Sequence, residues 1–196
     1  MKSPMPVDVP WWIYPLVGAA LFIAACVWGY LKYREYRFRK GNQAAISNIA
    51  YEILRDVLVP NGNGGHIHLH YVLLTQRGLL VLDLLDLPGA IFGGDQMIEW
   101  TAIGRKRRYT FPNPQHSLYD RMAAVKLLSG DVPVDGRVVF TTRSEFPKGR
   151  PRNVLRIDDL PSQFPPVDRA RGNITAAFGD VWANVKRNSE PNPLAA

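Results

Sequence analysis

The chain has 196 residues, and its 24 Lys and Arg residues exceed its 17 Asp and Glu residues, so the formal net charge is +7. This length suits one domain with one hydrophobic core plus short additional segments. The single cysteine, Cys26, excludes an intramolecular disulfide framework and is typical of a reducing cytoplasm. The basic balance favours acidic partners, such as a membrane surface that carries anionic lipid.

The N-terminal part contains a long apolar segment. Residues 11–31 read WWIYPLVGAALFIAACVWGYL and carry no charge. As a helix, this segment is long enough to cross the roughly 30 Å hydrocarbon layer of a bilayer. Aromatic side chains, which prefer the headgroup boundary, lie near both ends: Trp11, Trp12, Tyr14, Trp28, Tyr30 and Tyr33. We therefore expect one transmembrane helix at residues 11–31.

A basic segment, residues 32–40, follows and predicts the orientation of this helix. It contains Lys32, Arg34, Arg37, Arg39 and Lys40 against a single Glu35. By the positive-inside rule, residues 1–10 lie outside the cell membrane and the rest of the chain is cytoplasmic. A cleaved signal peptide is disfavoured, because the apolar run is too long and its basic flank is on the wrong side. A lipoprotein signal ending at Cys26 is disfavoured because the apolar run continues past that residue.

Residues 41–187 predict one soluble domain, and residues 188–196 a flexible tail. Apolar residues at three- and four-residue spacing predict an amphipathic helix over residues 44–58. A glycine-rich loop follows at residues 60–65. Residues 66–75 and 79–84 predict an antiparallel hairpin, since a short glycine-containing connection joins them.

Further elements alternate along the rest of the chain. Short strands are predicted at residues 90–92, 97–103, 107–111, 137–142 and 154–157. The pair Asn113 and Pro114 predicts the start of a helix that ends near Gly130. A last helix, residues 167–186, places Ile174, Ala177, Phe178, Val181, Trp182 and Val185 on one side. The fold class is α/β, with a mixed, largely antiparallel sheet flanked by helices.

Four short motifs in this order resemble one known family. They are Gly-Leu-Leu-Val-Leu-Asp at residues 78–83, Gly-Ala-Ile-Phe-Gly at 89–93, Glu-Trp-Thr at 99–101 and Asn-Pro at 113–114. Together they resemble the nuclease-related domain (NERD) family over about residues 41–160. That family is similar to the restriction-endonuclease-like superfamily, so the resemblance implies that fold and a nuclease site that uses a divalent ion.

The resemblance also implies which residues such a site needs. Two carboxylates hold the ion, usually Mg²⁺, and a lysine two residues after the second carboxylate helps to activate water. Here Asp83 matches the second carboxylate, but Leu85 stands at the lysine position. The first aspartate position corresponds to His70, and Tyr71 follows in place of the usual histidine.

Two further polar positions of the family also differ in this chain. The glutamate of the first helix corresponds to Ser47, although a shifted register offers Glu52. The glutamine of the second helix corresponds to Ser117, with Gln115 nearby on a different face. We therefore interpret the domain as one that retains the family fold and lacks most of the nuclease site, with Asp83, His70 and Glu52 as vestigial candidates.

Histidines at alternate positions suggest a different kind of site. His66, His68 and His70 project from one face of a regular strand, so a metal site with Asp83 or Asp86 is one interpretation. The candidate ligands are Asp83, His70 and His68. The other interpretation is the polar start of a strand with a hydrogen-bonded histidine.

A second basic run, Arg105, Lys106, Arg107 and Arg108, is a candidate for binding nucleic acid or lipid. Cationic side chains contact phosphates without sequence preference, and a hairpin near the inner leaflet attracts anionic lipid. We favour a solvated or lipid-facing hairpin, because few aromatic residues are interleaved for base stacking.

Two functions therefore remain open. The preferred one is a membrane-anchored, non-catalytic interaction module that needs no cofactor and contacts lipid, nucleic acid or another membrane protein. The alternative is a nuclease that depends on Mg²⁺ or Mn²⁺ and cleaves DNA or RNA through a variant site.

Overall fold

The computed structural model describes residues 10, 13–105, 107–167 and 173–193. The chain divides into two compact units, residues 1–41 and 42–196. Helix α1, Ile13–Asn48, begins in the first unit and ends in the second.

In the first unit, α1 is continuous through the basic residues 32–40. The helix from Leu16 onward is long and apolar enough to cross a membrane, and the side chains of its apolar part are exposed. Arg39 forms an ion pair with Glu35 one turn earlier, at 2.7 Å. Trp11, Trp12 and residues 1–9 of the predicted outer segment lie outside the described residues.

The predicted amphipathic helix over residues 44–58 is confirmed only for residues 44–48, which form the end of α1, and is wrong beyond them. Helix α1 ends at Asn48 and strand β1, Glu52–Pro60, follows after three residues. The apolar spacing resembles that of a helix because the strand buries side chains on both faces of the sheet. Ile53 and Leu54 pack into the core clusters on opposite faces. Asp56 has a φ of 48°, in the left-handed region, and beyond it the odd-numbered residue Val57 joins the cluster of Leu54. This break in alternation produces a helix-like pattern of apolar residues.

The larger sheet of the second unit has six strands. Besides β1 they are β2 (His66–Thr75), β3 (Gly78–Leu85), β7 (Val134–Phe140), β9 (Val154–Arg156) and β10 (Glu190–Pro191). Their order is β10-β1-β2-β3-β7-β9; pairs up to β3 are antiparallel, and β3-β7-β9 run parallel. The predicted hairpin of residues 66–75 and 79–84 is confirmed as β2 and β3. Part of the predicted tail pairs with β1 as β10.

Gly78 allows the tight turn between β2 and β3. Its φ is +118°, and a Cβ at this position would lie 2.4 Å from the carbonyl oxygen of Pro133. Only glycine combines this conformation with such a close backbone approach.

A second sheet of four strands has the order β6-β5-β4-β8. Strands β4 (Gly89–Phe92), β5 (Glu99–Ile103) and β6 (Arg108–Pro112) are antiparallel neighbours, and β8 (Ser144–Glu145) runs parallel to β4. The first three confirm predicted strands with slightly shifted ends. Trp100 of β5 is fully buried and stacks on Phe140 of β7, which joins this sheet to the main core.

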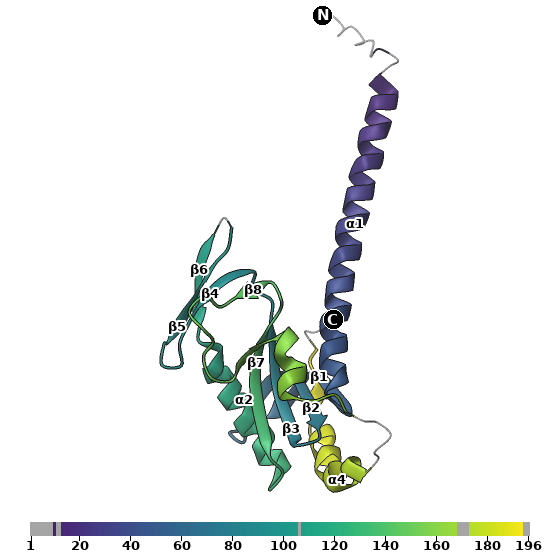
Figure 1. The fold of residues 1–196 in the computed structure, drawn as a ribbon. Helices are drawn as coiled ribbons and strands as arrows, with labels where there is room; N and C mark the ends of the chain where they lie inside the picture. Colours follow the sequence, from purple (N-terminus) through teal and green to yellow (C-terminus); the bar gives the residue numbers. More distant parts are fainter. Residues whose placement is uncertain (1–9, 11–12, 106, 168–172, 194–196) are drawn as a thin grey trace, which may run out of the picture. The chain divides into compact units, whose positions relative to one another are not determined.

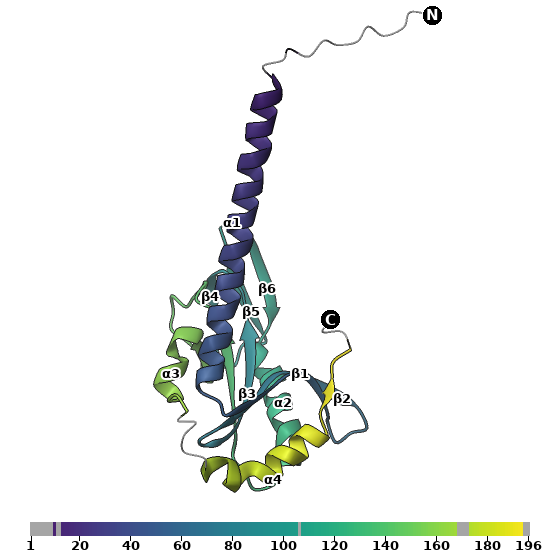
Figure 2. The ribbon, with the colours of Figure 1, turned by 90° about the vertical axis from the view of Figure 1, so that its right-hand side faces the viewer.

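Helices cover both faces of the large sheet (Figures 1 and 2). On one face, α2 (Pro114–Ser129) and α4 (Asn173–Arg187) pack against Val72, Val81 and their neighbours. On the other, the end of α1, the 3-10 helix η1 (Ile157–Asp159) and α3 (Leu160–Gln163) cover Leu80 and Leu82. The mixed α/β class is confirmed, and Asn113 caps α2 as predicted. In the last predicted helix, residues 168–172 and the side chains of Ile174 and Ala177 lie outside the described residues.

Candidate functional site

Strand β3 carries Asp83 in the middle of the large sheet. The residue is only 2% exposed, although its neighbours on β3 are mostly apolar. The register of β2 against β3 pairs Tyr71 with Leu82, so His70 lies beside Asp83. The register of β1 against β2 places Asp56 opposite His70, because Arg55 pairs with Tyr71 and Val57 pairs with Leu69.

Arg121 of α2 balances the buried charge of Asp83. Its Nη1 donates to Oδ2 of Asp83 at 2.6 Å, and its Nε donates to the backbone oxygen of His68 at 2.8 Å. A carboxylate with so little access to water is stable as an anion only beside a cation and its hydrogen bonds. A guanidinium stays charged at every physiological pH, so a change of pH in this range does not remove the positive charge beside this carboxylate.

The other oxygen of Asp83 faces His70. The Nδ1 of His70 lies 3.4 Å from Oδ1 of Asp83, but neither atom has a hydrogen-bond partner among the described residues. His70 meets His68 edge to face, with 5.0 Å between ring centroids. His68 Nε2 in turn lies 3.4 Å from Oδ1 of Asp56. A continuous polar row thus extends across three strands and a helix. It consists of five side chains: Asp56, His68, His70, Asp83 and Arg121.

These residues do not fit a divalent metal ion as they are arranged. Among the described residues, no group of three or more His, Cys, Asp or Glu side chains is placed to hold one. Arg121 occupies one oxygen of Asp83, and a metal ligated by Asp83, His70 and His68 would require that ion pair to open. The metal interpretation therefore stays a prediction.

Two further residues, Leu85 and Tyr71, stand at positions where the family resemblance implies polar residues of a nuclease site. Leu85 is partly buried and packs against the main core cluster, where it provides neither an amine nor a hydroxyl. Tyr71 packs on the opposite face of the sheet, and burial raises the pKa of its phenol. Asp86, the other carboxylate considered as a ligand, pairs with Arg143 and accepts a bond from the Thr141 hydroxyl at 2.7 Å.

The sequence comparisons decide the family. The sequence model of the nuclease-related domain family matches residues 33–141, more than half of the chain. The chain belongs to this family. An uncharacterized protein of Bacillus anthracis is 22% identical over 116 residues, which cover 57% of this chain and 55% of that protein. The chain thus matches about half the length of that curated relative, and no solved structure matches significantly.

In the NERD domain, Glu52 lies away from the Asp83 carboxylate. It begins β1, and it accepts bonds from Trp182 Nε1 at 2.7 Å and from Lys186 Nζ at 2.8 Å, both on α4. The bond from Lys186, followed by that from Trp182, lowers the pKa of Glu52 below its ordinary value. Four residues separate Glu52 from Asp56 along the strand, a distance of about 13 Å at 3.3 Å per residue. The structure therefore does not bring Glu52 together with Asp83 and His70.

The two candidate residues of helix α2 do not reach Asp83 either. Ser117 is exposed, and Gln115 is buried, in contact with the β4–β5 loop and the loop before β9. The Gln115 amide donates to Asp95 Oδ1 at 3.0 Å and to the backbone oxygen of Arg152 at 2.5 Å. This position holds two loops together. Ser47 lies near the end of α1, where its hydroxyl bonds the oxygen of Ala44.

Sequence reasoning missed Arg121 and Asp56. For Arg121 a signal was present: the residue is three positions after Leu118 and four before Val125, inside the apolar stripe of α2. A charged residue in such a stripe needs a buried partner. For Asp56 the sequence offers little, because its place depends on strand pairing and on a left-handed backbone conformation.

The second basic run forms an exposed turn. Arg105 and Arg107 lie in the connection between β5 and β6, Arg108 begins β6, and all three are exposed. Lys106 lies outside the described residues. Exposed apolar side chains flank the turn, since Ile103 is 42% and Tyr109 is 38% exposed.

Replacement of Arg121 tests the role of the buried ion pair. Arg121→Met leaves the Asp83 carboxylate without its cation, so we expect the free energy of unfolding to fall by about 3–5 kcal/mol. The double variant Asp83→Leu, Arg121→Met removes the charge itself and should recover much of this loss. Chemical denaturation of the full chain in detergent measures both values. Arg107→Met, at an exposed position, should stay within about 0.5 kcal/mol. A double variant as unstable as the single one would contradict this explanation.

Proposed function

We propose that this protein is a single-pass membrane protein whose cytoplasmic NERD domain is non-catalytic and acts by binding. The observation that carries the proposal is the Arg121–Asp83 ion pair, because it neutralises the one family carboxylate that the chain retains. Leu85 at the lysine position supports the same conclusion, since a leucine cannot orient or activate water. We further infer a restriction-endonuclease-like arrangement, on the support of the β1-β2-β3 meander joined through α2 to the parallel strand β7.

A nuclease with a variant site is the second candidate. The observation that favours it is the buried Asp83 Oδ1 beside His70 Nδ1, two polar atoms that lack a hydrogen-bond partner among the described residues. In this second candidate function, Arg121 would move away from Asp83. Asp83 and His70 would then form the site with a bound Mg²⁺ or Mn²⁺ ion. Unsatisfied buried polar atoms are uncommon outside functional sites, so this candidate merits a direct test.

A cleavage assay separates the two candidates. We expect the full chain in lipid nanodiscs to leave single- and double-stranded DNA and RNA intact with either Mg²⁺ or Mn²⁺. Asp83→Asn removes the retained carboxylate, and Asp120→Asn is the control, an exposed position beside Arg121 on α2. Cleavage that disappears in Asp83→Asn and persists in Asp120→Asn would overturn the non-catalytic proposal. Cleavage equal in both variants would indicate a contaminating nuclease.

The proposed topology follows from the charges that come directly after the apolar part of α1. The segment at residues 32–40 carries five basic residues, and such segments remain in the cytoplasm. A green fluorescent protein fused after the last residue should therefore fluoresce, and an alkaline phosphatase fused there should be inactive. Neutralising Arg34, Arg37 and Arg39 to Gln should weaken this bias. An active phosphatase fusion in the unaltered chain would overturn the orientation.

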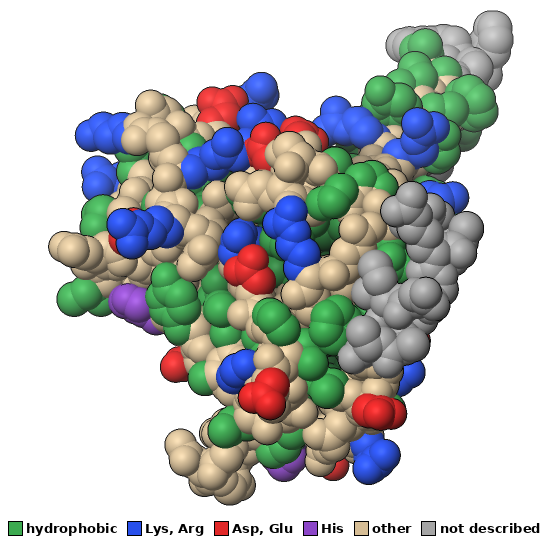
Figure 3. Space-filling model, turned by 60° about the horizontal axis from the view of Figure 1, so that its bottom comes forward, with side chains coloured by type: hydrophobic (Ala, Val, Ile, Leu, Met, Phe, Trp, Pro, Cys, Tyr) green, Lys and Arg blue, Asp and Glu red, His purple; other side chains and the backbone are tan. Residues whose placement is uncertain are grey.

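For the basic turn between β5 and β6 we propose anionic lipid as the partner. Arg105, Arg107 and Arg108 lie beside exposed Ile103 and Tyr109, a combination that suits a headgroup boundary. A nucleic-acid groove is less well supported, because few aromatic residues are interleaved with the basic ones for base stacking. On the face of the molecule drawn in Figure 3, basic side chains are interspersed with acidic ones. A membrane anchor on the same chain would keep the lipid surface within reach.

Fluorescence quenching tests the lipid contact. A fluorophore at Thr110→Cys, in a Cys26→Ser background, should be quenched by spin-labelled lipid in nanodiscs that contain anionic lipid. Replacing Arg105, Arg107 and Arg108 by Gln should remove about 3 kcal/mol of attraction, about 1 kcal/mol per residue, and abolish the quenching. Replacing Arg77, on the β2-β3 turn, should leave the signal unchanged. Quenching that is equal in neutral nanodiscs, or absent throughout, would contradict the lipid proposal.

A further inference from the structure

A cavity of about 280 Å³ opens at the edge of the large sheet, away from Asp83. Polar side chains of β7, the loop before β9 and α3 line it, namely Arg137, Arg150, Arg152, Asn153 and Gln163, together with three apolar residues. Arg137 packs over the ring of Phe164, on the sheet face opposite to α2. The cavity is therefore separate from the Asp83 row.

The cavity exists because β9 is short. It pairs only with residues 138–140 of β7, so the first half of β7 has no strand beside it on this edge. Side chains bond the backbone of this half instead: Asp135 Oδ1 accepts from the Gly136 amide at 2.8 Å, and Arg137 Nη1 donates to the Gly136 oxygen at 2.6 Å. These bonds occupy backbone groups that another strand would pair with, so the β7 edge is less suited to strand pairing than to binding a small molecule.

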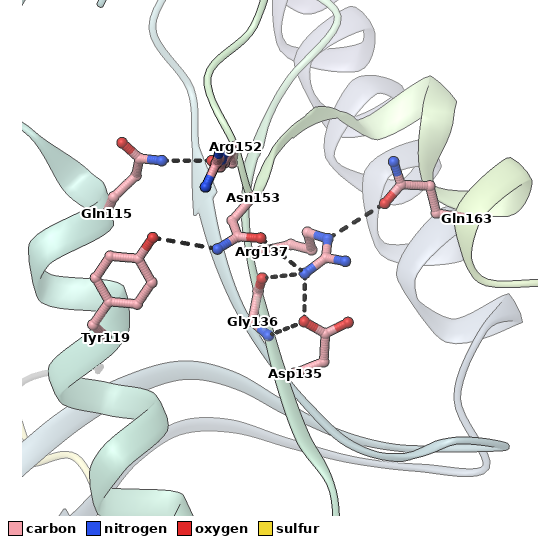
Figure 4. A network of polar contacts seen from close by, with 8 residues as sticks. All are labelled: Gln115, Tyr119, Asp135, Gly136, Arg137, Arg152, Asn153 and Gln163. Atoms are coloured by element: carbon pink, nitrogen blue, oxygen red, sulfur yellow. Dashed lines mark hydrogen bonds and ion pairs between the residues drawn. The ribbon is translucent and has the colours of Figure 1, made fainter. Parts of the chain in front are cut away.

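Arg137 is held in a fixed position. Its Nη1 also pairs with Asp135, and its Nε donates to Gln163 Oε1 at 3.3 Å. Figure 4 shows Gln163 and Asn153 approaching its guanidinium from opposite sides. Its side chain is only 18% exposed, so this guanidinium is partly shielded from water. Its hydrogen bonds to described residues use Nε and Nη1, which leaves Nη2 as the nitrogen for a ligand.

The other two arginines come from the loop before β9. Arg150 pairs with Asp159 of η1, and the Arg152 amide donates to Asp95 Oδ1 at 2.8 Å. The Arg152 side chain is 88% exposed, with its Nε 3.8 Å from Asp95 Oδ2. The left-handed backbone of Asn153, with a φ of 57°, turns the chain sharply into β9.

The lining of the cavity is strongly one-sided in charge. Of the described residues that line it, three carry a positive charge and none carries a negative one. The carboxylates of Asp135, Asp159 and Asp95 contact the arginines and do not line the cavity. They balance the cations when no ligand is bound and fix the orientation of Arg137 and Arg150. Guanidinium groups held in this way are organised in advance for an anion.

We propose that this cavity binds the phosphate of a small phosphomonoester. The planar guanidinium fork matches phosphate geometry, and three such groups suit a dianion better than a carboxylate. The volume lies at the lower end of ligand pockets, which suits a mononucleotide or a smaller molecule. All but one of the lining residues follow residue 141, where the family match ends, so the site is independent of the Asp83 row and of the proposed function.

Calorimetry on the full chain in nanodiscs of neutral lipid tests the proposal, with adenosine monophosphate and inorganic phosphate as probes. We expect saturable binding of one adenosine monophosphate per chain and no binding of adenosine. The double variant Arg150→Gln, Arg152→Gln should weaken binding at least tenfold. Each Arg→Gln change removes one positive charge, so the control Arg156→Gln, next to the cavity but outside its lining, is compared with the single variants Arg150→Gln and Arg152→Gln. It should alter affinity less than twofold, and each single variant should weaken binding more than the control does.

Three results would overturn the proposal. The first is the absence of binding by both probes in the unaltered chain. The second is a loss of affinity in Arg156→Gln equal to that in the single variants, which would indicate a general charge effect. The third is binding of a 5′-phosphorylated trinucleotide without binding of adenosine monophosphate, which would assign the cavity to the end of a nucleic acid. Circular dichroism of each variant verifies that it is folded, and Arg137 is left intact because it supports the sheet edge.

Discussion

A single buried carboxylate determines how helix α2 sits on the sheet. Asp83 is almost inaccessible to water, so Arg121 must reach it, and the same guanidinium also bonds the backbone of β2. One side chain thereby joins the helix to two central strands. Apolar packing of Leu118 and Val125 holds the helix against the sheet, whereas the ion pair selects its position along the strands, because a displaced helix would leave the charge without a partner.

The protein uses arginine in two different ways. At Asp83 the acid is buried deeper than the base, and Arg121 forms an ion pair with the carboxylate to which the family resemblance assigns a metal ion. At the edge of β7 the arginines line an open cavity, whereas the carboxylates paired with them are not among its lining residues. The first arrangement favours a stable fold and the second favours recognition of an anion. Taken together, the two proposals place the binding chemistry of the domain at the β7 edge and not at Asp83.

The sequence predicted those elements whose patterns are local. The run of apolar residues in β3, the glycine between β2 and β3 and the Asn113 cap of α2 are read correctly because neighbours along the chain determine them. The error at residues 44–58 arose where Asp56 interrupts the alternation of a strand. The row at Asp83 was partly foreseen through His70 and His68, but its partners come from strand pairing and from α2. The arginine cavity was not foreseen, since it unites a strand, a loop and a helix whose residues show no shared motif.

The core of the domain extends well beyond the segment that matches the family. Trp182 and Val185 of α4 are buried against the same cluster as Val72, and Leu160 and Phe164 cover the opposite face of the sheet. A fragment cut at the end of the family match, residue 141, would expose apolar surface on both sides and leave β7 as a bare edge, a combination that promotes aggregation. A fragment that keeps this core must therefore extend through α4, and β10 adds a short strand beside β1.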